Sequence, residues 1–80
     1  MEFFLYSKSE CQLCDDFLTG VRELLNPPAH VCHVINIDND PDLQQRYGAR
    51  VPVLVAGNTE LCEQVFNQDV ITAFLAKQAS

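Results

Sequence analysis

The sequence has no long hydrophobic run. Its 80 residues contain no stretch close to the about 20 consecutive apolar residues that a membrane-spanning helix needs. The apolar segment at residues 3–6 is too short for the core of a secretory signal peptide, and no basic residue precedes it. We therefore expect a soluble, cytoplasmic protein that does not bind membranes.

Basic residues are also few. The chain has 5 Lys and Arg residues against 11 Asp and Glu residues, which gives a formal charge of -6. Phosphate backbones repel such a surface, and no basic stripe interleaved with aromatic residues offsets the repulsion. We therefore do not expect the protein to bind nucleic acid. Because the acidic residues are scattered along the sequence, we interpret them as a solvated surface.

Glycine and proline are scarce, with 3 and 4 residues, and no low-complexity segment or internal repeat is visible. Hydrophobic residues make up 48% of the chain, so enough apolar surface is available for a small core. We expect one ordered, monomeric domain over residues 1–80.

The first half of the chain is predicted to form a strand, a helix and a second strand. Residues 2–6 are apolar at nearly every position, which is typical of a strand covered on both faces. From residue 11 to residue 25, apolar residues recur every three or four positions, as in a helix with one buried face. Gly20 in this helix predicts a close approach to the sheet. Residues 31–37 are rich in β-branched residues and predict a second strand, parallel to the first.

The second half adds a helix, a hairpin and a last helix. Asp40-Pro41 is a helix start, and Gly57-Asn58 is a two-residue hairpin turn between strands at 51–56 and 59–62. Asn67 caps the last helix, whose core-facing residues are expected to be Val70, Ile71, Phe74 and Leu75. The predicted fold is α/β, in the order β-α-β-α-β-β-α, with a four-stranded mixed sheet flanked by three helices.

Cys11 and Cys14 are separated by two residues and lie at the start of the first predicted helix, after the first predicted strand. The free N–H groups and the positive dipole end of a helix stabilise a thiolate at this place. A spacing of three brings the two sulfurs to one helix face, near disulfide distance. The pattern favours a disulfide that forms and breaks. Glu10, Asp15 and Asp16 oppose thiolate formation, so we expect a reducing pair.

The same cysteine spacing also occurs in zinc sites, which need four ligands. The candidates for the other ligands are His30, Cys32, His33 and Cys62. Alternation along a strand points Cys32 and His33 to opposite faces, so redox chemistry is favoured over metal binding. Cys32 and Cys62 are expected to behave as small hydrophobic residues near the sheet.

On these features the chain resembles the glutaredoxins, a branch of the thioredoxin fold. Lys8 precedes the cysteine pair by three positions, and Val51-Pro52 opens the third strand. Further motifs are similar to a small bacterial glutaredoxin-like family: Cys11-x-Leu13-Cys14, Asp38-x-Asp40-Pro41, Tyr47-Gly48-x-x-Val51-Pro52-Val53 and Glu60-Leu61-Cys62.

The resemblance implies a thiol–disulfide oxidoreductase that reduces or exchanges protein or small-molecule disulfides, with a reductase or glutathione as electron donor. Cys11 would be an exposed nucleophilic thiolate and Cys14 the more buried resolving thiol. Pro52 would be a cis proline that leaves the polar groups of its strand end free. The implied substrate-binding residues are Lys8, Gln12, Leu13, Arg50, Val51 and Pro52. No metal or tightly bound cofactor is implied.

The chain also departs from the glutaredoxin pattern. Gln12-Leu13 replaces the usual Pro-Tyr, Arg50 replaces a threonine, and Leu61-Cys62-Glu63 replaces the motif that binds the γ-glutamyl end of glutathione. Glutathione is therefore a candidate co-substrate only, and Cys62 is a candidate for a second disulfide. The alternative function is a non-catalytic thioredoxin-fold module that binds a metal, an iron–sulfur cluster or a partner protein.

Overall fold

The computed structural model of the protein describes residues 1–25 and 30–79. Seven elements follow one another along the chain: β1 (Glu2–Ser7), α1 (Gln12–Leu25), β2 (Val31–Asn36), α2 (Pro41–Tyr47), β3 (Val53–Ala56), β4 (Thr59–Glu63) and α3 (Gln68–Ala79). This is the predicted β-α-β-α-β-β-α order.

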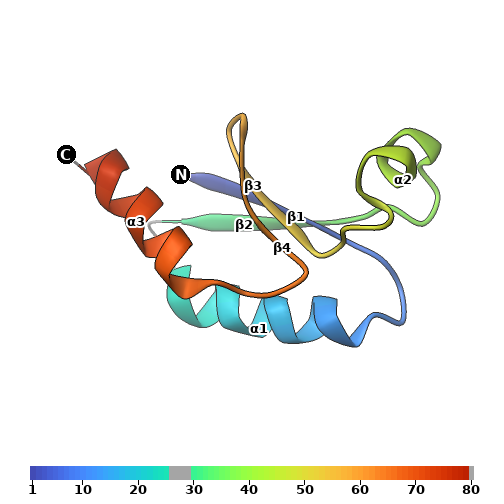
Figure 1. Ribbon diagram of the computed structural model, residues 1–80, viewed down its shortest axis with the longest axis horizontal. Helices are drawn as coiled ribbons and strands as arrows, with labels where there is room; N and C mark the ends of the chain where they lie inside the picture. Colours follow the sequence, from blue (N-terminus) through green and yellow to red (C-terminus); the bar gives the residue numbers. More distant parts are fainter. Residues whose placement is uncertain (26–29, 80) are drawn as a thin grey trace.

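The four strands form one mixed sheet in the order β2-β1-β3-β4. β1 pairs parallel to β2, as the helical connection between them requires, and antiparallel to β3. Gly57, with φ of 60°, makes the turn of the β3–β4 hairpin. In Figure 1, α1 runs along one side of the sheet and α3 lies at the end that holds both termini. α2 stands at the opposite end, near the start of α1.

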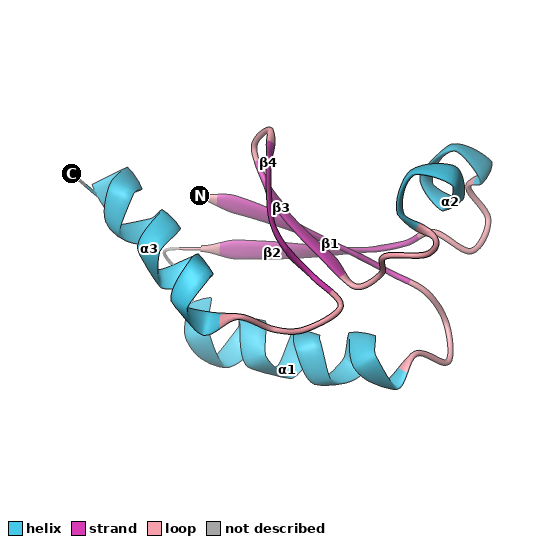
Figure 2. Ribbon diagram, in the orientation of Figure 1, coloured by secondary structure: helices cyan, strands magenta, loops and turns pink. Residues whose placement is uncertain are grey.

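The larger core fills the space between the sheet and the helices α1 and α3, which Figure 2 shows in cyan. Alternate residues of β1 and β3 meet one face of α1 there. Its buried members are Phe3, Leu5, Phe17, Val21, Leu25, Leu54, Ala56 and Ile71. Burial of each large side chain stabilises the fold by about 1.5–3 kcal/mol.

A second, smaller core lies at the α2 end of the sheet, and it includes both cysteines of the predicted site. Its buried members are Cys11, Cys14, Ile37, Tyr47, Val51, Val53 and Val55. The disulfide region is thus built into the packing that holds α2 on the sheet.

Three expectations about packing need correction. β1 is fully covered on one face only, because α2 shields just one end of the other face and leaves Phe4 and Tyr6 half-buried. Gly20 approaches Phe66 before α3 rather than the sheet, since a Cβ at Gly20 would lie 2.9 Å from the Phe66 ring. Val70 is 38% exposed and does not belong to the core face of α3.

Candidate functional site

Cys11 is the N-cap residue of α1. Its carbonyl accepts the first helical hydrogen bond, from the Asp15 N–H at 3.1 Å. Its Sγ accepts a hydrogen bond from the Cys14 N–H at 3.2 Å, in the way that a serine or aspartate side chain caps a helix. Glu10, just before it, has a φ of 53°, in the left-handed region that few residues other than glycine adopt. The chain therefore turns sharply to bring Cys11 to the helix end.

Cys11 and Cys14 form a disulfide, with their Cα atoms 5.2 Å apart. Cys14 is 4% exposed and Cys11 is 9% exposed. The predicted order of burial is confirmed, but Cys11 is more deeply buried than the expected exposed nucleophile. The exposed side chains at this place are those of the two residues between the cysteines, and Leu13 is 56% exposed.

The Val51–Pro52 peptide bond is cis, as predicted. Both residues are buried, and Val51 shares the small core with Cys11 and Cys14. The polar groups of this segment are not all free, which corrects the expectation for them. The Val51 N–H donates to the Tyr47 carbonyl at 3.0 Å, and the Pro52 carbonyl accepts from the Gln64 N–H at 2.7 Å. These bonds tie the proline segment to α2 on one side and to the end of β4 on the other.

Arg50 precedes the cis proline segment and is held by acidic residues of β4. Its guanidinium donates to both carboxylate oxygens of Glu60, at 2.8 and 3.2 Å, and lies 3.7 Å from Glu63. The hydrogen bonds that Arg50 donates to Glu60 lower the pKa of Glu60 and raise the pKa of Arg50. Arg50 also lies over the ring of Tyr47, 5.3 Å from its centroid. A substrate carboxylate would have to displace Glu60 to reach this group.

Lys8 is exposed on the loop that leads to Cys11, and that loop is fixed to the end of β2. The Ser9 N–H donates to both oxygens of Asp38 at 3.3 Å, and the Asn36 side chain donates to the Ser9 hydroxyl at 3.2 Å. The pKa of Asp38 is lowered, chiefly by hydrogen bonding from Ser9, with the charge of Lys8 as a smaller cause. The positioning roles of Ser9 and Asp38 are not among the expectations from the sequence. The Asp-x-Asp-Pro motif was the available signal.

Two tyrosines stack beside the disulfide. The rings of Tyr6 and Tyr47 have centroids 4.2 Å apart and planes 18° apart. Tyr47 belongs to the small core with the cysteines, and Tyr6 packs against that core. Burial raises the pKa of Tyr6, and Tyr47 raises it further. The tyrosine pair therefore packs with both cysteines in the small core on the side of α2.

The remaining cysteines and histidines do not converge on the pair. Cys32 and Cys62 are free thiols on β2 and β4, the two opposite edges of the sheet, and both are half-buried. Burial raises the pKa of each thiol. His33 is bound to Glu2 at 2.9 Å. Within residues 1–25 and 30–79, no group of three or more His, Cys, Asp and Glu side chains is arranged to hold a metal ion.

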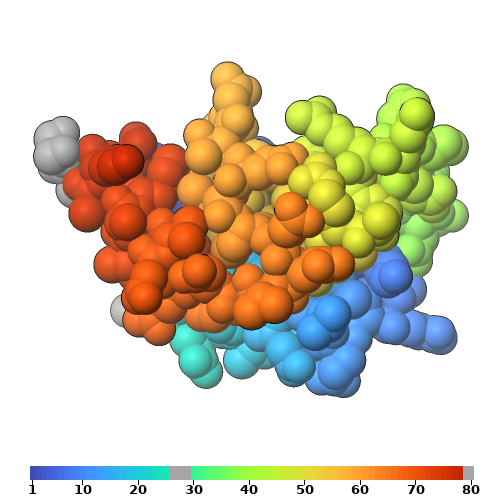
Figure 3. All heavy atoms as spheres, in the orientation of Figure 1, coloured from blue at the N-terminus to red at the C-terminus, as the bar shows by residue number. Residues whose placement is uncertain are grey.

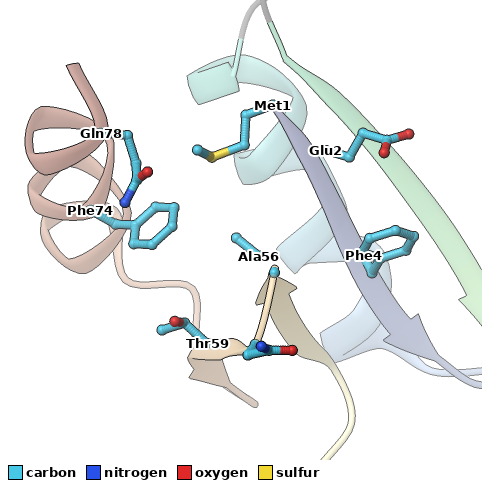
Figure 4. A pocket seen from close by; sticks show the side chains of 9 residues that line it. Met1, Glu2, Phe4, Ala56, Thr59, Phe74 and Gln78 are labelled. Carbon is cyan, nitrogen blue, oxygen red and sulfur yellow. The ribbon is translucent and has the colours of Figure 1, made fainter.

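A pocket of the described residues lies away from the cysteines. It has a volume of about 450 Å³ and lies between the first residues of β1, the β3–β4 turn and α3, where Met1, Ala56 and Phe74 face it (Figure 4). None of the predicted site residues lines this pocket. The disulfide and the residues predicted to bind substrate therefore lie outside this pocket.

Comparison with known proteins identifies the fold and the family. The profile of a family described as "Glutaredoxin-like domain (DUF836)" matches residues 2–76. No curated protein matches the chain. In the part of the chain that the structure describes, no helix is long and apolar enough to cross a membrane.

Solved structures agree with this match. Protein Ne2328 from Nitrosomonas europaea is 36% identical, with a TM-score of 0.79, over 91% of this chain and 88% of that one. Protein XcR50 from X. campestris is 30% identical, with a TM-score of 0.72, over 94% of this chain and 96% of that one. The germline-specific thioredoxin Deadhead from Drosophila melanogaster is 22% identical over 95% of this chain and 78% of that one, and its TM-score of 0.59 shows the shared thioredoxin fold.

Proposed function

Because the chain belongs to the glutaredoxin-like domain family, we propose that it is a thiol–disulfide oxidoreductase whose reactive pair is Cys11 and Cys14. The observation that carries the proposal is the disulfide at the start of α1, with the Cys14 N–H directed at Cys11 Sγ over 3.2 Å. In the reduced protein, the same N–H and the helix dipole stabilise a Cys11 thiolate. Of the two sulfurs, Cys11 belongs to the more exposed residue and is the nucleophile.

The reaction has two exchange steps. Cys11 thiolate attacks one sulfur of a substrate disulfide, the substrate disulfide breaks, and the other substrate sulfur leaves as a thiolate. Cys14 then loses its proton to solvent and attacks Cys11 Sγ, which releases the second substrate thiolate. The protein dithiol has given two electrons to the substrate and is left as the Cys11–Cys14 disulfide. A reductase or glutathione returns the two electrons.

The surrounding residues have separate roles in this proposal. Gln12 and Leu13 are exposed between the cysteines and are the first side chains that an incoming substrate meets. Val51 packs with both cysteines in the small core, the buried Pro52 follows it, and Lys8 lies on the loop before Cys11. Because Glu10, Asp15 and Asp16 oppose thiolate formation, the expected potential lies at the reducing end of the range from about -270 to -180 mV.

A disulfide reduction assay tests the function. The reduced protein should reduce insulin or hydroxyethyl disulfide, and Cys11→Ser should abolish the activity. Cys14→Ser should retain the first step and accumulate a mixed disulfide at Cys11, visible by mass spectrometry. Cys62→Ser is the matched control and should retain turnover. If the wild-type protein turns over no disulfide, or if Cys11→Ser retains full activity, the proposal is wrong.

A further inference from the structure

The acidic residues, scattered in the sequence, gather at the disulfide end of the folded chain. Of the 11 acidic residues, 8 lie on the loop before α1, the first turns of α1, the segment from Asp38 to Arg50, and β4. Only 3 of the 5 basic residues lie in these segments. The disulfide end thus carries a formal charge of -5, and the rest of the molecule carries -1.

Each basic residue at this end interacts with an acidic residue, and Arg50 does so through ion pairs. Arg50 is held by Glu60 and Glu63. The charges of Lys8 and Arg46 act on Asp38 and Glu60, whose pKa values they help to lower. The residues directly before Cys11 and directly after Cys14 are acidic, and both of them, Glu10 and the first-turn residue Asp15, are exposed.

The same surface has an apolar centre. Leu13 and Val65 are large hydrophobic residues that are 56% and 72% exposed. Val65 follows Gln64, which is bound to the Pro52 carbonyl, and precedes Phe66, whose ring packs edge-on against Phe17 of α1 at 5.7 Å. Its loop is therefore fixed between the proline segment and α1, and Figure 3 shows the orange atoms of this region against the blue atoms of α1. An apolar centre with a charged rim is the usual anatomy of a protein-binding surface.

We propose that this surface binds cationic polypeptide segments that carry the disulfide to be reduced. The inference rests on the proposed function and names its substrate class. Leu13, between the two cysteines, and Val65, on the loop bound to the proline segment, provide apolar contacts, while Glu10 and Asp15 attract lysine or arginine side chains that flank the substrate cysteine. The tripeptide glutathione is anionic and small, so the acidic rim repels it and it covers little of the apolar centre.

Three symmetric peptide disulfides test the proposal. The peptides share one frame, with leucine next to a single cysteine, and differ only in flanking residues: lysine, serine or glutamate. The rate constant for reduction by the reduced protein is measured at about 10 mM and 500 mM salt. Each value is divided by the rate constant of the same peptide with dithiothreitol, which corrects for the effect of the flanking charges on the leaving thiol. At low salt the lysine peptide should react at least about tenfold faster than the glutamate peptide, and at high salt the ratio should fall to about two or three.

The outcomes distinguish failure of the oxidoreductase function from failure of the substrate preference. If no peptide reacts, the proposed oxidoreductase function fails. If all three react at equal corrected rates at both salt concentrations, the function stands and the inference is overturned. A faster reaction of the glutamate peptide overturns it as well.

A pair of double variants locates the effect at the rim. Glu10→Gln with Asp15→Asn should lower the ratio of lysine-peptide to glutamate-peptide rates at least about threefold. Glu23→Gln with Asp69→Asn removes the same charge from the far half of α1 and the start of α3, and it should leave the ratio unchanged. An equal fall in both variants would mean that net charge alone sets the preference, which contradicts the inference.

Discussion

Arg50 and Glu60 form a two-point ion pair, at 2.8 and 3.2 Å, across the segment that contains the cis proline. The pair joins the residue before Val51 to the edge strand β4, and Arg50 also donates to the Arg46 carbonyl at the end of α2. The guanidinium thus has three internal partners: Glu60, the Arg46 carbonyl and Glu63. Because these partners offset the charge of Arg50, this residue does not make the site electropositive.

Release of Arg50 should make the protein react better with anionic disulfides. In Glu60→Gln, the guanidinium loses its two-point partner and is available to a substrate carboxylate. The rate constant with oxidised glutathione should rise by about two- to tenfold at low salt, while the rate constant with neutral hydroxyethyl disulfide stays within about twofold. Glu23→Gln removes one distant negative charge and serves as control. An unchanged glutathione rate in Glu60→Gln would show that Arg50 does not face the substrate.

Protonation of Asp38 should weaken the fold at acidic pH. Because the pKa of Asp38 is lowered in the folded protein, its ionised form stabilises the folded state above the unfolded pKa of about 3.9. That contribution is lost as the pH falls through the folded pKa. The difference in unfolding free energy between wild type and Asp38→Asn should be constant between about pH 5 and 7 and should shrink below about pH 4. Urea denaturation at several pH values measures it, and a difference that grows on acidification would contradict the assignment.

The order of elements could be predicted from the sequence because it depends on local patterns. Apolar periodicity marked β1 and α1, and Asp40 does cap α2, with its side chain accepting the Leu43 N–H at 3.1 Å. The cysteine pair and Val51-Pro52 could be found for the same reason, since each is a short motif beside a predicted boundary.

The contacts that fix the site could not be predicted in this way. Ser9 meets Asp38 across 29 residues, and Phe66 meets Gly20 through the packing of the β4–α3 loop on α1. Such pairs depend on where the folded chain brings distant segments together. The exposure of Val70 has the same origin, because helical spacing alone does not tell which side of a wide apolar stripe meets the sheet.

The two sheet cysteines should react slowly with alkylating agents. Burial raises the pKa of Cys32 and of Cys62, so the thiolate fraction of each at neutral pH is lower than in an unfolded peptide. In the oxidised protein at pH 7.5, iodoacetamide should label both at least about fivefold more slowly than a cysteine peptide, with rates that increase as the pH rises. Reduction of the Cys11–Cys14 disulfide should add one residue that iodoacetamide labels rapidly, Cys11. Mass spectrometry of the intact protein and its peptides measures both, and rapid labelling of Cys32 or Cys62 at pH 7.5 would contradict the prediction.

A methyl group at Gly20 should destabilise the fold although it favours the helix. Alanine in place of glycine stabilises a helix interior by about 1 kcal/mol. The new Cβ would lie 2.9 Å from the Phe66 ring, which is held against Phe17, and overpacking of this kind costs about 1–3 kcal/mol. We therefore expect Gly20→Ala to lower the unfolding free energy, and Gly20→Ala with Phe66→Leu to be less destabilised than the sum of the two single variants. Thermal and urea denaturation measure these values. A Gly20→Ala protein more stable than wild type would show that Phe66 moves away without cost.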